Sequence, residues 1–96
     1  MSENQGKTGQ RLILMDGTTI ENGTAGYSQG VLCCWFTGYT LPQAAQMFLD
    51  PAKTGRIVFE YGQMSDEYEG FTNCTYLMID VDGKVSVCLT RGDQDV

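Results

Sequence analysis

The chain has 96 residues, with twelve acidic side chains, six basic ones and no histidine, so its net charge is −6. This length suits one compact domain, and 42% hydrophobic and 19% charged residues are typical of a globular chain. The lack of positive charge argues against direct binding to nucleic acid or to an anionic membrane. Without histidine, the chain has no Ser–His or Cys–His catalytic pair and no histidine-ligated metal.

The two ends of the chain are predicted to lie outside the domain. Residues 1–10 are polar and without hydrophobic periodicity, so we expect a flexible arm there, a single domain over 11–91 and a frayed end at 92–96. The first ten residues lack the apolar core of a signal peptide, and the longest apolar run, Val31–Phe36, is too short to cross a bilayer. We therefore expect a cytoplasmic protein, in the host cytoplasm if a phage encodes it, whose four cysteines are thiols.

In chain order, the first predicted element is a β-hairpin. The run Arg11–Met15 meets Asp16-Gly17 and continues as 18–21, which is typical of two strands joined by a tight turn. The glycine-rich stretch 22–30 is too irregular to assign. Val31–Phe36 is predicted as a strand with two apolar faces, which has to be covered on both faces or to meet a partner.

One helix is predicted after this strand. Thr40 is the expected N-cap, and Gln43 completes a capping box with it, while Pro42 lies in the first turn. Pro51 ends the helix after about three turns, because a residue before proline avoids the helical conformation. The helix is expected to lie across a sheet with one apolar stripe, formed by Leu41, Ala44, Ala45 and Phe48.

The rest of the chain is predicted to be β-structure. Arg56–Tyr61 alternates, with Ile57, Phe59 and Tyr61 on one face, and the polar segment 62–70 links it to a hairpin of 71–80 and 84–90. In that hairpin, a three-residue loop with a left-handed Gly83 aligns the apolar residues of both strands, whereas a two-residue loop mixes the faces.

These elements predict a single small α+β domain of the order β-β-β-α-β-β-β. We expect one mostly antiparallel sheet of five to six strands, with one short helix packed on one face.

Most of the net charge lies in the segment 60–69, whose acids contribute −4 without a base among them. Carboxylates beside aromatic rings suit a protein interface, because rings supply contact area and acids attract basic partners. A sharper hypothesis is a phosphate mimic that occupies the basic groove of a nucleic-acid-binding protein. The alternatives are a solvated loop whose acids keep the protein soluble, or a cation site. The predicted partner-binding residues are Glu60, Tyr61, Asp66, Glu67, Tyr68, Glu69 and Phe71.

Other motifs favour structural interpretations. Asp80-Val-Asp82-Gly83 begins like a calcium loop, but its glycine comes too early and its twelfth position is Arg91, so we predict a hairpin turn. A structural zinc site needs two cysteines with two to four residues between them, whereas Cys33 and Cys34 are adjacent and point to opposite faces of a strand. A redox site of the C-x-x-C type is also absent from the sequence. We interpret Trp35 as a core residue and expect no cofactor, no metal and no catalytic residue.

The segments Leu12-Ile-Leu-Met-Asp-Gly-Thr18 and Ile79-Asp-Val-Asp-Gly-Lys-Val-Ser-Val87, with a short helix between them, resemble small uncharacterised proteins encoded by phages and prophages of Gram-positive bacteria. The resemblance spans most of residues 11–91. It implies a mobile-element origin, but no site residue can be carried over. Proteins of this kind act by binding, as parts of the virion or as inhibitors of host defence such as anti-CRISPR proteins.

We therefore expect a non-enzymatic acidic protein that inhibits a host or defence protein by binding to its basic surface. The alternative is a phage tail or virion component that self-associates through the strand Val31–Phe36. A third class, an enzyme that uses a thiol or a carboxylate, has no supporting motif in the sequence.

Overall fold

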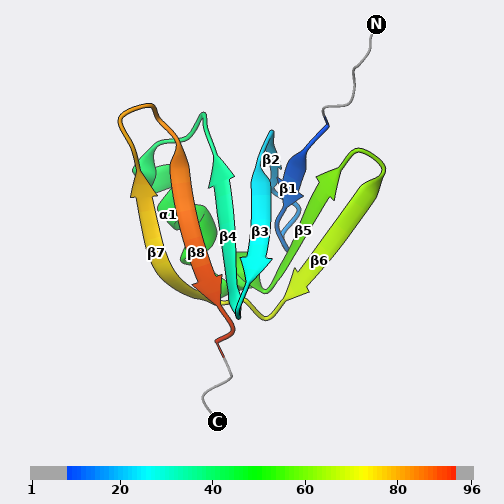
Figure 1. Cartoon of the computed structure of the whole chain (residues 1–96). Coiled ribbons are helices and arrows are strands. Elements are labelled where there is room, and N and C mark those ends of the chain that lie inside the picture. The colour runs from blue at the N-terminus through cyan, green and yellow to red at the C-terminus, as the bar shows by residue number, and fades with distance from the viewer. Residues whose placement is uncertain (1–8, 93–96) are drawn as a thin grey trace, which may run out of the picture.

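The computed structural model describes residues 9–92, and they form two four-stranded antiparallel sheets and two short helices (Figure 1). In spatial order, the first sheet consists of β2 (Thr19–Glu21), β1 (Arg11–Ile13), β5 (Arg56–Tyr61) and β6 (Met64–Glu69). The second sheet consists of β3 (Thr24–Ser28), β4 (Val31–Phe36), β8 (Val85–Thr90) and β7 (Asn73–Ile79). The helices are α1 (Leu41–Phe48) and α2 (Pro51–Thr54). No helix among these residues has the length and apolar character needed to cross a membrane.

The α+β class and the antiparallel arrangement are confirmed, but the single sheet of five to six strands is wrong. Two segments that were not predicted as strands supply the additional strands: the glycine-rich stretch contains β3, and the polar segment 62–70 contains β6. The chain passes from the first sheet to the second at Asn22, which has a left-handed φ of 64°. Gly23 follows because a Cβ there would lie 2.8 Å from the Leu12 Cδ1 atom.

The predicted ends of the domain lie largely outside the described residues. Of the predicted arm 1–10, the structure describes only Gly9 and Gln10, and of the predicted frayed end 92–96 only Gly92. The carbonyl oxygen of Gln10 accepts a hydrogen bond from the Asn22 amide at 2.8 Å, and the Gly92 amide donates to the Gly70 carbonyl oxygen at 3.2 Å. Gln10 and Gly92, one residue beyond each predicted boundary, are therefore both hydrogen-bonded to residues of the domain.

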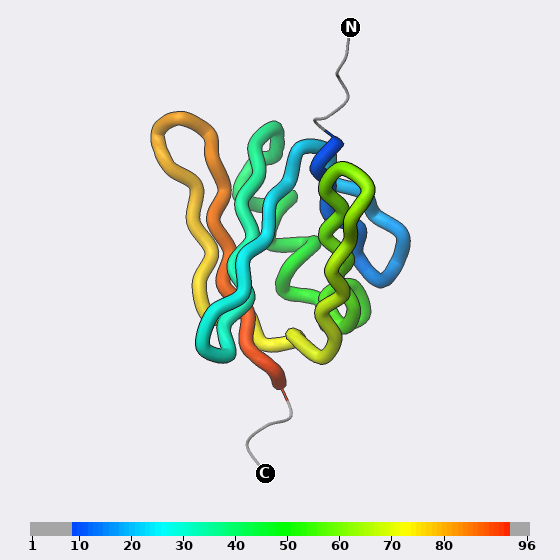
Figure 2. Tube along the Cα trace, turned by 45° about the vertical axis from the view of Figure 1, so that its right-hand side comes forward, coloured from blue at the N-terminus to red at the C-terminus, as the bar shows by residue number. Residues whose placement is uncertain are grey.

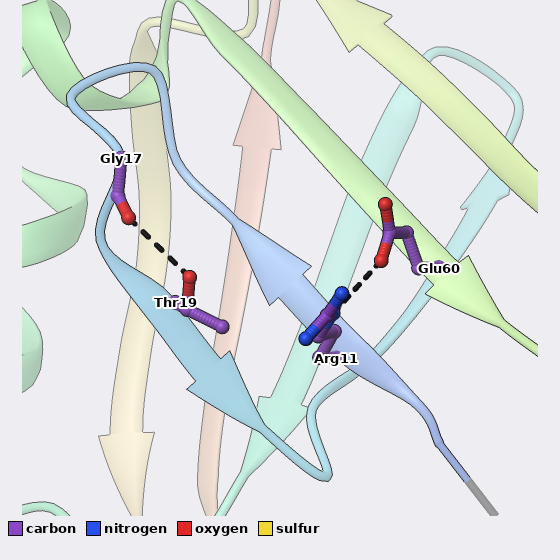
Figure 3. A network of polar contacts seen from close by, with 4 residues as sticks. All are labelled: Arg11, Gly17, Thr19 and Glu60. Atoms are coloured by element: carbon purple, nitrogen blue, oxygen red, sulfur yellow. Dashed lines mark hydrogen bonds and ion pairs between the residues drawn. The ribbon is translucent and has the colours of Figure 1, made fainter.

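The first hairpin forms as predicted, with β1 and β2 joined at Asp16-Gly17. Gly17 has a φ of 94°, which favours glycine. The Thr18 amide donates to the Asp16 carboxylate at 3.0 Å, and this hydrogen bond lowers the pKa of Asp16. Thr19 Oγ1 then donates to the Gly17 carbonyl oxygen (Figure 3). The turn is held by short-range contacts, which is why its residues predict it.

The strand β4 also forms as predicted, and its two faces have different neighbours. Leu32, Cys34 and Phe36 are buried, while the alternate residues point to the outer face of the second sheet and are half-buried. Trp35 belongs to this outer set, so its interpretation as a core residue is wrong. Both edges of β4 are hydrogen-bonded, to β3 and to β8. The strand is therefore central, and its edges are not available to a second subunit.

The cap of α1 is confirmed, but its apolar stripe is only partly right. Gln43 N donates to Thr40 Oγ1 at 3.3 Å, and the Gln43 side chain accepts from the Thr40 amide at 2.8 Å. Leu41 is 41% exposed and Met47 is buried. The helix has only eight residues, about two turns, and its buried residues are Ala44, Met47 and Phe48. Pro51 follows the end of α1 and is also the first residue of the next helix, α2.

The last hairpin, β7 and β8, has the predicted loop and register. The Asp80 amide donates to the Lys84 carbonyl oxygen at 3.0 Å, and Gly83 has a φ of 84°. Ile79 lies opposite Val85, and the pairing continues through the strand until a bulge between Cys74 and Tyr76. The bulge was not predicted.

Both sheets and α1 contribute to one core. The helices lie on the side of the second sheet that faces the first (Figure 2). The rings of Phe36 and Phe48 stack with their centroids 5.4 Å apart and join β4 to α1. The buried hydrophobic residues are Leu12, Leu14, Ile20, Leu32, Cys34, Phe36, Ala44, Met47, Phe48, Ile57, Phe59, Phe71, Val85, Val87 and Leu89.

Candidate partner-binding surface

The polar segment 62–70, which we expected to be a link between strands, contains the edge strand β6. Within residues 9–92, β6 pairs with β5 alone, and all its residues except Tyr68 are exposed. Gly62, with a φ of 63°, reverses the chain between the two strands. A weak signal was present in the sequence. The larger apolar side chains, Met64 and Tyr68, fall on one side of the strand, and the other side is entirely polar. The high charge of β6 concealed this alternation.

The register of β6 divides the predicted residues between two sides of the first sheet. Glu69 lies opposite Arg56, and Glu67 lies opposite Val58. Together with Glu60, these two acids occupy the outer side. Tyr61, Asp66 and Tyr68 occupy the inner side, which continues into the core. Only a partner that approaches along the free edge of β6 contacts both sets.

On the outer side, two arginines pair with the three acids. Arg11 Nε lies 2.8 Å from Glu60 Oε1 (Figure 3), and this contact raises the pKa of Arg11 through the hydrogen bond and the opposite charge. Arg56 forms an ion pair with Glu67 and lies 3.8 Å from Glu69 Oε2. The local charge is therefore smaller than the segment alone suggests. The sequence conceals this because Arg11 is 49 positions away from Glu60.

The outer side is also hollowed. A shallow depression of about 590 Å³ is lined by Ile13, Arg56, Val58, Glu60, Ser65 and Glu67. Two of the predicted partner-binding acids, Glu60 and Glu67, lie on its wall. Its lining combines the apolar side chains of Ile13 and Val58 with the carboxylates of Glu60 and Glu67, which suits a partner side chain with an aliphatic stem and a basic head.

On the inner side, aromatic rings form two groups, Phe59 with Tyr61 and Tyr68 with Tyr27 and Phe71. Tyr61 Oη donates to Asp66 Oδ2 at 3.0 Å, and this hydrogen bond raises the pKa of Tyr61. The ring of Tyr68 stacks against Tyr27 of β3, with centroids 6.1 Å apart. Tyr27 is 48% exposed. Sequence reasoning missed Tyr27 because it lies in the unassigned glycine-rich stretch.

Phe71, which we predicted to be a partner-binding residue, is buried. Its side chain is 1% exposed, and its ring lies edge-on to both Tyr27 and Tyr68. The Arg91 guanidinium covers the ring, with its carbon 4.9 Å from the centroid. Phe71 therefore packs beneath the exposed Tyr27 and the half-buried Tyr68.

The remaining motifs occupy structural positions. Asp80 Oδ1 accepts the amides of Asp82 and Lys84 at 2.9 and 3.0 Å, so this motif is the predicted hairpin turn. Cys33 and Cys34 point to opposite faces, as predicted, and all four cysteines are free thiols. Burial raises the pKa of Cys34 far above that of an ordinary thiol. In the part of the chain that the structure describes, no three Cys, Asp or Glu side chains gather as a metal site.

Comparison with protein families, with curated proteins and with solved structures finds no match to this chain.

Proposed function

We propose that this protein is a non-enzymatic protein-binding module that inhibits a host or defence protein, and that its contact strand is β6, whose second edge is paired with no other strand among residues 9–92. The observation that carries the proposal is the combination of an exposed edge with three acids along it, Asp66, Glu67 and Glu69. An edge strand offers unpaired backbone donors and acceptors to an extended partner segment. The inhibitory role rests on the resemblance to small phage proteins, which act as inhibitors of host defence or as parts of the virion.

The chemistry of β6 selects a basic partner segment. A strand that adds to β6 would place alternate side chains beside Glu67 and Glu69 on one side and beside Asp66 and Tyr68 on the other. The phosphate-mimic version has less support, because Arg56 pairs with two of the carboxylates that would imitate phosphates.

Neutralising β6 tests the proposal. The triple variant Asp66→Asn, Glu67→Gln, Glu69→Gln should capture less of the partner from a lysate of the native host, and should bind the purified partner about tenfold or more weakly at low salt. High salt should weaken wild-type binding in the same direction.

The matched control is Asp82→Asn, which removes an exposed carboxylate from the hairpin of the second sheet. It should bind like the wild type. Equal affinity of the triple variant and the wild type, together with insensitivity to salt, would refute the proposal. Circular dichroism of each variant shows whether the fold is retained.

A second candidate function, self-association within a phage particle, is supported by the composition of the second sheet. Its four strands contain no charged residue, and Tyr76 and Met78 are exposed on its outer face at 47% and 40%. Self-association by backbone pairing with Val31–Phe36 has less support, because both edges of β4 are hydrogen-bonded to β3 and β8. Association through the outer face remains.

Sedimentation over a range of concentrations tests this second candidate. A dimer that Met78→Glu dissociates, and that Val81→Glu at the fully exposed hairpin tip leaves intact, would support it. A monomer at every concentration would contradict it.

A further inference from the structure

Two cysteines on the outer face of the second sheet are placed for direct reaction with each other. Cys33 of β4 and Cys88 of β8 are opposite one another in the strand register, and their sulfur atoms lie 3.2 Å apart. Opposite residues in antiparallel strands have Cα atoms about 4.5 or 5.5 Å apart, and both separations fall in the range of disulfides. The sulfurs can therefore be joined by rotation of the side chains, without movement of the backbone.

The other two cysteines have different surroundings. Cys34 points into the core and has no exposed surface. Cys74 packs against the core from β7, lies opposite Leu89, and its thiol donates to the Tyr76 carbonyl oxygen at 3.5 Å. Cys33 and Cys88 are both half-buried, so a small reagent can reach them from the outer face.

We propose that Cys33 and Cys88 form a reversible intramolecular disulfide, and that the oxidant is a small-molecule disulfide such as oxidised glutathione. One protein thiolate attacks the glutathione disulfide, forms a mixed disulfide and releases one glutathione. The second protein thiolate attacks the protein sulfur of the mixed disulfide, forms the Cys33–Cys88 bond and releases the second glutathione. The protein loses two electrons and two protons, and the two glutathione thiols gain them.

The bond would cross-link the two central strands of the second sheet. Cys33 and Cys88 are 55 positions apart, so the disulfide would close a long loop and restrict the unfolded chain strongly. Burial, and then the hydrogen bond with Cys33, raises the pKa of Cys88 to about 11. Cys88 is therefore protonated at neutral pH and attacks slowly, because the thiolate is the nucleophile.

The test treats the purified full chain with oxidised glutathione and then reads intact mass, peptide maps and thermal unfolding. The wild type and the control Cys74→Ser should lose two hydrogen atoms and give one linked peptide pair, Cys33 with Cys88. Oxidation should raise their Tm by about 10 °C or more, and dithiothreitol should reverse the shift.

The variants Cys33→Ser and Cys88→Ser should lack both the linked peptides and the Tm shift, and should retain only a glutathione adduct. A wild-type chain that keeps glutathione adducts without closing the bond would overturn the proposal. Linkage through Cys74, or between two chains, would overturn it as well. All variants can be compared in their reduced state, where equal Tm values show that the serine substitutions are tolerated.

Discussion

At Thr54, in α2, a hydroxyl group is buried without a partner. The side chain has no exposed surface, and its Oγ1 atom forms no hydrogen bond with any residue that the structure describes. A buried polar group without a hydrogen bond destabilises the folded state, because it loses its contact with water and gains nothing in exchange. The sequence contained no sign of this, since a threonine in a one-turn helix near a proline would ordinarily be exposed.

We expect Thr54→Val to raise the free energy of unfolding by about 1 kcal/mol, because a methyl group of similar shape replaces the unpaired hydroxyl. Thr54→Ala is the control: it also removes the hydroxyl but leaves a void, so it should lower the free energy of unfolding. Urea unfolding followed by circular dichroism measures both. If Thr54→Val destabilises the protein as much as Thr54→Ala, the hydroxyl has a partner.

Side-chain partners distant in sequence account for the largest difference between the predicted and the observed surface. Arg56 reaches Glu67, and Tyr27 reaches Tyr68 across the gap between two sheets. Neither contact could be predicted, because each depends on which strands become neighbours. The residue types suggested an interface, and the fold decided which of them are exposed.

At the scale of elements, those with local signals were predictable. The cap at Thr40 and the turns at Gly17 and Gly83 depend on hydrogen bonds within a few residues, so the sequence identifies them directly. The strands β3 and β6 were missed for a different reason. β3 is rich in small residues and β6 in acids, and each is a strand because a neighbour, β4 or β5, supplies its hydrogen bonds.

Edge position explains the unusual composition of these two strands. Both lie at the end of a sheet, where a strand is less buried than a central one and tolerates charge or glycine. By contrast, the central β4 has the two apolar faces that sequence alternation identified. The edge strands β2 and β7 were nevertheless predicted, because each belongs to a hairpin with a glycine turn, at Gly17 and at Gly83.

For the molecule as a whole, the two sheets depend on one core. Ile57 of the first sheet is buried in the same cluster as Val87 and Phe48, which belong to the second sheet and to α1. Neither sheet has a separate core of its own. The chain should therefore unfold as one cooperative unit, as small single domains usually do.

The single tryptophan makes this cooperativity measurable, because Trp35 lies in the second sheet while Ile57 lies in the first. We expect Ile57→Ala to lower the free energy of unfolding by about 2–5 kcal/mol. Trp35 fluorescence and circular dichroism should shift together to lower urea concentration. Val58→Ala, on the outer side of the same strand, should have a much smaller effect. A Trp35 transition that Ile57→Ala leaves in place would mean that the sheets unfold separately.

The amino-acid sequence by itself determined the short-range features: one helix and its cap, two glycine turns, the register of the last hairpin and the two faces of β4. These features arise from backbone preferences and from hydrogen bonds between residues close in the chain. The signal for each feature therefore lies within the short segment that forms it. Only the tertiary structure decided the division into two sheets, the pairing of Arg11 and Arg56 with the acids, and the meeting of Cys33 with Cys88. These depend on which apolar faces are buried together, and that choice is made by the whole chain.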